Sequence, residues 1–251
     1  MEQYATAQQV WVAGLVMFRV GSMVMVMPGV GEAYIPPRLR LCFALLIALC
    51  LAPSVASSLP PIPQGVGDMA GAVFKETLIG LMIGGLLRLF VFTLTTTGEL
   101  VSLQTNLSFA QTANPTEASP GATVSTFLSI LGLTLIFVTD LHHLFIAAIA
   151  RSYTLFAPTK PINIADGATL MAVTIGKCFA LGLQLAAPVV VFAIVFNLTI
   201  GLVGRAMPQF QVFFVATPLS LLLGLSIFAL SLGGIGLVWL QNYDTFMRLF
   251  V

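Results

Sequence analysis

Residues 178–204 read CFALGLQLAAPVVVFAIVFNLTIGLVG and contain no charged side chain. A second uncharged run, Val212–Asn242, follows after the short joint RAMPQFQ at residues 205–211. A helix needs about 20 apolar residues to cross the hydrocarbon of a bilayer. Two helices joined by so short a segment lie antiparallel as neighbours. The end of the chain is therefore predicted to be a helical hairpin in a membrane.

Four residues shape this predicted hairpin. Pro188 and Pro218 fall inside the two arms and predict kinks, because proline removes a helical hydrogen bond. Pro208 and Gln209 fall in the joint, where the chain must reverse direction.

The composition extends this interpretation to the whole chain. Hydrophobic residues make up 58% of the 251 residues and charged residues only 8%, whereas a soluble domain carries about 25% charged residues. The net charge is +1 and no run of basic residues occurs, which argues against nucleic acid as a partner. The three cysteines lie in apolar stretches at a spacing that fits no metal motif.

Uncharged runs and prolines divide the chain into segments. They predict an all-α integral membrane protein with one membrane domain over residues 1–251, built from about six long, kinked hydrophobic helices arranged as hairpins. The predicted helices run from Val10 to Met27, from Leu41 to between Leu51 and Ser58, from Met69 to at least Thr97, from Gly121 to about Ala150, from Cys178 to Gly204, and within Ala206–Tyr243.

The third predicted helix carries an unusual polar stripe. Thr95, Glu99, Ser102 and Asn106 recur at three- and four-residue spacing, so they share one helical face. A helix continuing to Ser108 would be roughly 60 Å long, twice the hydrocarbon thickness of about 30 Å. We expect this helix to break, or part of it to lie against protein or water.

The segment Ser108–Gly121, SFAQTANPTEASPG, is predicted to be a loop. Irregular backbone at membrane depth is tolerated only where protein or a water-filled cavity covers it. Its one aromatic residue, Phe109, suggests two roles: obstructing a narrow wet passage, or anchoring the loop against neighbouring helices. Both roles remain open.

Charges inside apolar helices are costly and usually functional, although those near an interface can extend their charged ends into water. Lys75 and Glu76 are adjacent on a helix and point to different sides, so their partners must come from other helices or other chains. Lys177 is a further charge of this kind. The polar residues predicted to be buried or inter-subunit are Arg19, Glu76, Arg88, Glu99, Asn106, Asp140 and Arg205.

Asp140, His142 and His143 raise the question of a metal or catalytic site. Adjacent histidines do not share a helical face, and no HExxH, GxSxG, Walker or GxGxxG pattern occurs. These residues are therefore predicted to be a polar helix end, with no catalytic residue, metal or cofactor. Two alternatives stay open: an intramembrane hydrolase using Asp140 and His142, and a secondary transporter with discontinuous helices, which would show inverted repeats that we do not find.

Short pieces in a characteristic order match a known family. The chain resembles the FliR family of flagellar export-gate proteins, whose injectisome counterpart is the T subunit. The matching pieces are Phe18-Arg19, Pro28, Pro36-Pro37-Arg38-x-Arg40, Glu76 with Gly80 and Gly84, Gly98-Glu99, Gln104, Leu107 to Ala110, Asn114-Pro115, His142, Ser152-Tyr153, Ala187-Pro188, Asn197, Gly201, Arg205, Met207-Pro208-Gln209, Val212-Phe213 and Pro218.

The resemblance implies a non-enzymatic subunit of a type III secretion export gate in the bacterial inner membrane, at the flagellar basal body. Residues 1–165 would be similar to the P subunit and residues 166–251 to the hairpin of the Q subunit. The partners implied are FliP-like and FliQ-like subunits, FlhB-like and FlhA-like components, membrane lipid and exported unfolded flagellar proteins. The loop would plug the closed channel through Phe109, Ala110, Gln111, Asn114 and Pro115.

Overall fold

The computed structural model describes residues 2–107, 123–160, 164–207, 209 and 211–248. Within these ranges the chain forms helices and no strand. Five helices are long and apolar enough to cross a membrane, or six spans if one broken pair is counted as a single crossing. The predicted class, an all-α integral membrane protein, is confirmed.

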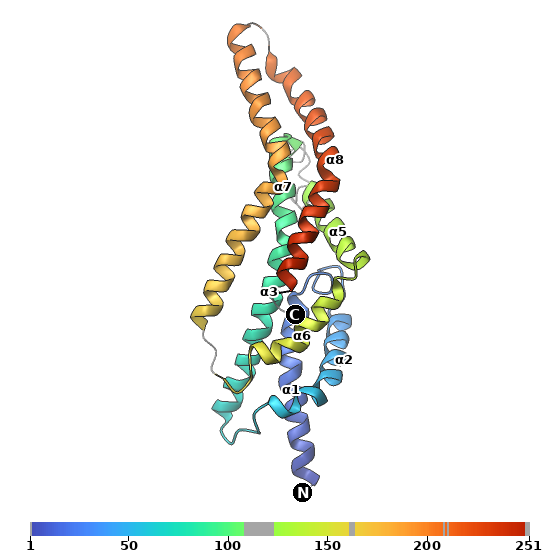
Figure 1. The fold of residues 1–251 in the computed structure, drawn as a ribbon, viewed down its shortest axis with the longest axis vertical. Helices are drawn as coiled ribbons and strands as arrows, with labels where there is room; N and C mark the ends of the chain where they lie inside the picture. The colour runs from blue at the N-terminus through green and yellow to red at the C-terminus, as the bar shows by residue number, and fades with distance from the viewer. Residues whose placement is uncertain (1, 108–122, 161–163, 208, 210, 249–251) are drawn as a thin grey trace. The chain divides into compact units, whose positions relative to one another are not determined.

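Figure 1 shows the helices in the order in which they follow one another along the chain. They are α1 (Glu2–Val26), α2 (Pro37–Val55), the short 3-10 helix η1 (Ala56–Ser58), α3 (Val66–Gln104), α5 (Thr123–Val138), α6 (His142–Leu155), α7 (Ile164–Ala206) and α8 (Val212–Met247).

Helix α3 is one continuous helix of 39 residues. It is longer than the hydrocarbon layer is thick, yet it does not break. Helix α7 begins at Ile164, well before the predicted start at Cys178. The predicted start follows Lys177, because a charge is costly in hydrocarbon. A charged residue does not interrupt the hydrogen bonds of a helix, so the helix begins earlier. Helix α2 ends at Val55, just past Pro53 and within the predicted range.

The fourth predicted helix was wrong in one respect: it is two helices. Helix α5 ends at Val138 and α6 begins at His142. Between them Asp140 adopts a left-handed backbone conformation with φ of 57°, which aspartate tolerates better than most residues. The backbone N–H of His143 then donates to the Asp140 carbonyl, 3.1 Å away, as the next helix starts.

The chain divides into two compact units, each assembled from separate stretches. The first contains Met1–Phe90, Thr139–Ile175 and Thr245–Val251, and the second contains Val91–Val138 and Gly176–Asp244. Helices α3, α7 and α8 contribute to both units. These units reflect spatial packing, whereas the predicted division at residue 165 concerns likeness to other subunits and stays a prediction.

In the first unit α1 packs closely against α3. Buried apolar residues of α1 recur every four positions, as at Val12, Val16 and Val20. Opposite them, Gly80 of α3 lies so near the backbone of α1 that an added Cβ would overlap the carbonyl oxygen of Arg19. Small residues one turn apart allow helices in membranes to approach this closely.

In the second unit the predicted polar stripe of α3 lies mainly between helices of this chain. Thr95 Oγ1 lies 3.0 Å from Ser129 Oγ of α5, and Asn106 Nδ2 donates to Ser220 Oγ of α8 over 2.9 Å. Helices α7 and α8 of this unit form the predicted hairpin, and a Cβ added at Gly224 of α8 would lie 3.6 Å from the ring of Phe192 of α7 (Figure 1). Hydrogen bonds of hydroxyl and amide groups thus help to hold these helices together. Apolar contacts alone add little inside a bilayer, because lipid tails are as apolar as the side chains.

Candidate functional site: a buried ion pair at a helix end

A buried ion pair joins α1 and α3 in the first unit. The side chains of Arg19 and Glu76 lie in the interior, with 0% and 2% of each residue exposed. Arg19 Nη2 donates to Glu76 Oε1 over 3.1 Å, and Arg19 Nε donates to Glu76 Oε2. Two parallel bonds between a guanidinium and a carboxylate fix their relative orientation as well as their charge.

The same guanidinium holds the end of α6. Its Nη1 donates to the carbonyl of Ser152 over 3.0 Å and its Nη2 to the carbonyl of Phe156 over 3.1 Å. The guanidinium carbon also lies 4.2 Å from the centre of the Tyr153 ring, a cation–π contact. The Ser152 carbonyl also accepts the backbone N–H of Phe156 over 2.9 Å. Carbonyls in the last turn of a helix carry partial negative charge, so a cation beside them is stabilising.

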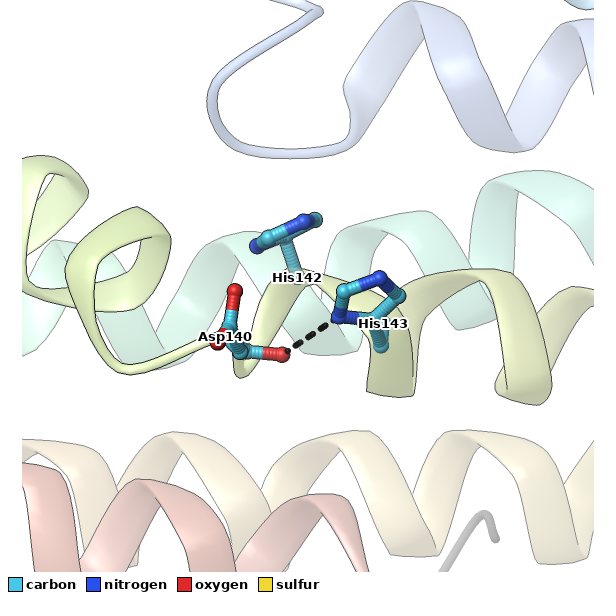
Figure 2. Close-up of side chains that lie close together, drawn as sticks. All are labelled: Asp140, His142 and His143. Atoms are coloured by element: carbon cyan, nitrogen blue, oxygen red, sulfur yellow. Dashed lines mark hydrogen bonds between the residues drawn. The ribbon is translucent and has the colours of Figure 1, made fainter.

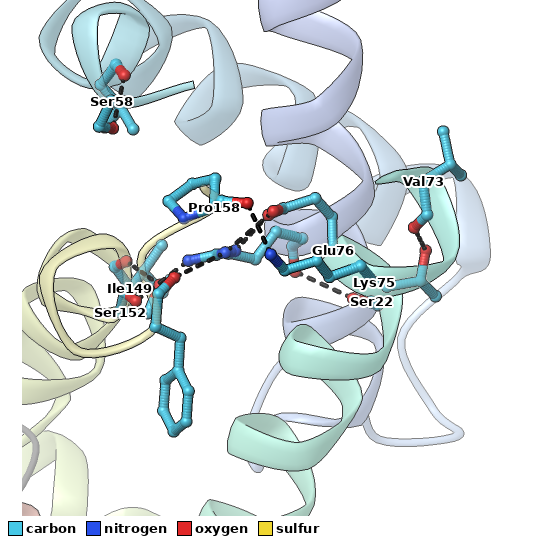
Figure 3. Close-up of polar contacts among 12 residues, drawn as sticks. Ser22, Ser58, Val73, Lys75, Glu76, Ile149, Ser152 and Pro158 are labelled. Carbon is cyan, nitrogen blue, oxygen red and sulfur yellow. Dashed lines mark hydrogen bonds and ion pairs between the residues drawn. The ribbon is translucent and has the colours of Figure 1, made fainter. Parts of the chain in front are cut away.

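The residue beside Glu76 binds the next part of the chain. Lys75 Nζ donates to the carbonyl of Pro158 over 2.6 Å and to the carbonyl of Lys160. Figure 3 shows Lys75 and Glu76 extending from one helix toward Ser152 and Pro158. Both charges therefore find their partners outside their own helix, as their positions on it predict.

We call Arg19, Glu76, Ser152, Tyr153 and Phe156 the arginine clamp. It joins three helices that are far apart in the sequence, and all its contacts lie within the first unit. A buried ion pair of this kind contributes little net stability compared with apolar packing, but removing one partner leaves an uncompensated charge. The arrangement is suited to holding α6 in place.

The other predicted polar residues lie nearer the surface of the single chain. Arg88 is about half exposed, with Nη2 3.8 Å from a carboxylate oxygen of Glu32. Asn106 is half-buried at the end of α3 and bonds to α8. Exposed in the chain by itself are Glu99, Asp140 and Arg205.

The remaining predicted site residues concern the loop and the hairpin. Pro188 and Pro218 lie inside α7 and α8, which continue through them. Gln209 is exposed between the two arms. Six further predicted site residues lie outside the described ranges: Phe109, Ala110, Gln111, Asn114, Pro115 and Pro208.

The sequence pointed to the two charges of the arginine clamp, but it did not point to the contacts of Arg19 with α6. The carbonyls of Ser152 and Phe156 carry no signal in a sequence, since every residue has one. Tyr153 carries a weak signal, because an aromatic ring is a common surface for an arginine. In the sequence the pair Ser152-Tyr153 stands out only through the family resemblance.

The long apolar helices and the buried charge pair define an integral membrane protein whose helices are joined through polar contacts. The chain belongs to the family described as bacterial export proteins, family 1, whose family model matches residues 10–246. This finding confirms the resemblance drawn from the short sequence pieces.

Curated relatives share one name, flagellar biosynthetic protein FliR. The chain is 58% identical to that of Caulobacter vibrioides over 250 residues, which cover 100% of both proteins. It is 31% identical to that of Pectobacterium carotovorum over 208 residues, 82% of this chain and 78% of the relative. It is 28% identical to that of Escherichia coli over 216 residues, 85% of this chain and 81% of the relative.

Proposed function

We propose that this chain is a structural, non-enzymatic subunit of a flagellar protein-export gate in the bacterial inner membrane at the basal body. The observation that carries the proposal is the 58% identity, over the full length, to a protein named flagellar biosynthetic protein FliR. The family name, bacterial export proteins, supports the same role.

The lengths of the helices support assembly with partner subunits. Helix α7 has 43 residues, which is about 65 Å at the usual rise per residue. Hydrocarbon covers only about 30 Å of such a helix. Exposed apolar residues nevertheless occur along most of α7, at Leu170, Val173, Ile175, Phe179, Leu183, Val191, Ile194, Val195, Leu198, Leu202 and Val203.

Lipid therefore covers only part of this apolar surface, and other protein helices must cover the rest. FliP-like and FliQ-like subunits are the proposed partners, with residues 166–251 packing as a Q-like hairpin. The exposed charges Glu99 and Arg205 are proposed to meet polar groups of these subunits or of FlhB-like and FlhA-like components, because unpaired charges are costly beside lipid.

The proposal extends to a closed channel for unfolded flagellar proteins. Its plug would be the loop whose sequence combines Phe109 with small polar residues. A bulky apolar side chain on such a loop is suited to closing a narrow wet passage.

Co-expression tests the proposal. We expect the tagged chain, made together with the FliP-like and FliQ-like proteins of its own organism, to purify from detergent as one stable complex. Made without them it should be degraded or aggregate. A monodisperse protein of one chain that is stable without partners would contradict the export-gate proposal and favour a secondary transporter.

A further inference from the structure

Two histidines and an aspartate meet where α5 ends and α6 begins. Asp140, His142 and His143 each offer one potential metal-ligating atom, and these atoms all lie within 4.8 Å of one another. The two imidazole rings have centres 4.2 Å apart (Figure 2). The chain has only these two histidines, so all its imidazole groups are at one place.

The local backbone brings Asp140 close to the two histidines, although these are adjacent on a helix. Adjacent residues inside a helix point in directions about 100° apart, which had argued against a chelate. His142 is the first residue of α6, and the left-handed Asp140 reverses the chain just before it. The break therefore brings the carboxylate back toward the imidazoles that follow it.

We propose that Asp140, His142 and His143 bind a divalent transition-metal ion of the zinc class. Two imidazoles and a carboxylate form a known zinc ligand set that leaves a fourth position for water or another group. Imidazole ligands favour Zn²⁺, Co²⁺ and Ni²⁺ over Mg²⁺ and Ca²⁺, which prefer sites made of oxygen atoms.

The distances are compatible with such a site after small side-chain rotations. Tetrahedral zinc with bonds of about 2.0–2.1 Å places its ligand atoms about 3.4 Å apart. Asp140 and His143 are exposed, so rotation about their side-chain bonds can close the difference. His143 Nδ1 also lies 3.2 Å from the Asp140 carbonyl oxygen, the kind of contact that orients a metal-binding histidine through its other ring nitrogen.

A bound ion would join the residue before the break to the first turn of α6. It would favour the left-handed conformation of Asp140, which is otherwise costly for a residue other than glycine. The ion would thus keep α5 and α6 as two helices. This role is separate from export itself, although its test uses the complex that the proposed function implies.

The test measures Zn²⁺ bound to the purified complex that contains the full chain. The affinity tag must contain no histidine, and Cys42→Ser with Cys50→Ser removes the two exposed thiols, which also bind zinc. Complexes are equilibrated with limiting Zn²⁺ in competition with a chelator of known affinity. The parent is compared with Asp140→Asn, with His142→Gln/His143→Gln, and with the control Asp68→Asn, which changes an exposed carboxylate in the first turn of α3.

We expect the parent complex to bind one Zn²⁺ more per chain than the double histidine variant. Asp140→Asn should weaken binding by at least about tenfold, since even the loss of a group that only orients a ligand costs 10–100-fold. Asp68→Asn should bind as the parent does. Equal Zn²⁺ binding by the parent and the double histidine variant would overturn the proposal, as would equal weakening by Asp68→Asn and Asp140→Asn.

A second measurement needs no substitution at the site, so it stands even if the variants fail to assemble. X-ray absorption of the ion bound to the parent complex should show nitrogen and oxygen ligands with imidazole scattering. Sulfur ligands, or no imidazole signal, would contradict the site.

Discussion

At the scale of single residues, Arg19 shows how a membrane protein makes a buried charge tolerable. Its guanidinium is fully buried, yet it donates to a carboxylate and to two carbonyls at the end of α6. Without these partners the charge would cost several kcal/mol in a low-dielectric interior. The clamp therefore depends on all its members being in place together.

Glu76→Ala should strongly reduce the amount of assembled complex. Arg19 would remain buried without its carboxylate, a loss of about 3–5 kcal/mol in comparable buried pairs. The measurement is the yield of intact complex from membranes, with swimming motility as a second readout.

The matched control is Glu32→Ala. Glu32 is 3.8 Å from the half-exposed Arg88, and such exposed pairs contribute little. Arg19→Met combined with Glu76→Leu should recover part of the lost yield, because neither charge then remains unpaired. Equal yields for Glu76→Ala and Glu32→Ala would contradict a stabilising role for the clamp.

At the scale of helices, close packing and helix ends decide the arrangement within each unit. Gly80 and Gly84 of α3 each lie against the backbone of α1, where an added Cβ would overlap carbonyl oxygens. In the second unit, α3 ends near Asn106, which has φ of 62° and bonds to α8. Both features set where a neighbouring helix can lie.

Gly80→Ala should destabilise the complex, by about 1–3 kcal/mol if it behaves as other overpacked positions do. The new methyl would meet the backbone of Arg19, and the backbone can move away only by disturbing the clamp. Thermal denaturation followed by size-exclusion chromatography would show a lower midpoint.

Gly71→Ala is the control on the same helix, because no atom lies within 4 Å of its added Cβ. It should be neutral or slightly stabilising, since alanine favours a helix over glycine by up to about 1 kcal/mol. A result in which both variants melt alike would show that the close approach at Gly80 is unimportant.

Substitutions of Asn106 separate its backbone conformation from its side-chain bond. Asn106→Gly keeps the left-handed conformation but loses the bond to Ser220, whereas Asn106→Ala loses the bond and strains the backbone. Alanine should therefore lower the thermal midpoint more than glycine, by a strain of about 1–2 kcal/mol. The opposite order would argue against a left-handed Asn106 in the assembled protein.

At the scale of the whole molecule, the exposed apolar surface is the dominant feature. Only 17% of the most apolar part of Pro37–Ser58 is buried within the chain, and only 22% of that of Phe214–Met247. This surface needs apolar surroundings, and the proposed assembly with partner helices would supply part of them beside lipid.

Deletion of residues 111–119 should leave the assembled complex leaky to ions and small solutes if the predicted loop plugs a channel. Conductance in planar bilayers would measure the leak, with assembly checked by size. Fewer assembled complexes without a leak would instead support the anchoring role of Phe109. An intact deletion complex as tight as the parent would contradict the plug.

The membrane class, most of the helices and the C-terminal hairpin could be predicted from sequence patterns. Hydropathy, run length and proline position are local properties, and the bilayer translates them directly into helices. Tertiary structure alone decided that Arg19 pairs with Glu76, 57 positions away, and that backbone carbonyls complete the clamp. It also decided the break at Asp140, because a left-handed aspartate depends on the packing around it and has no distinct pattern in the sequence.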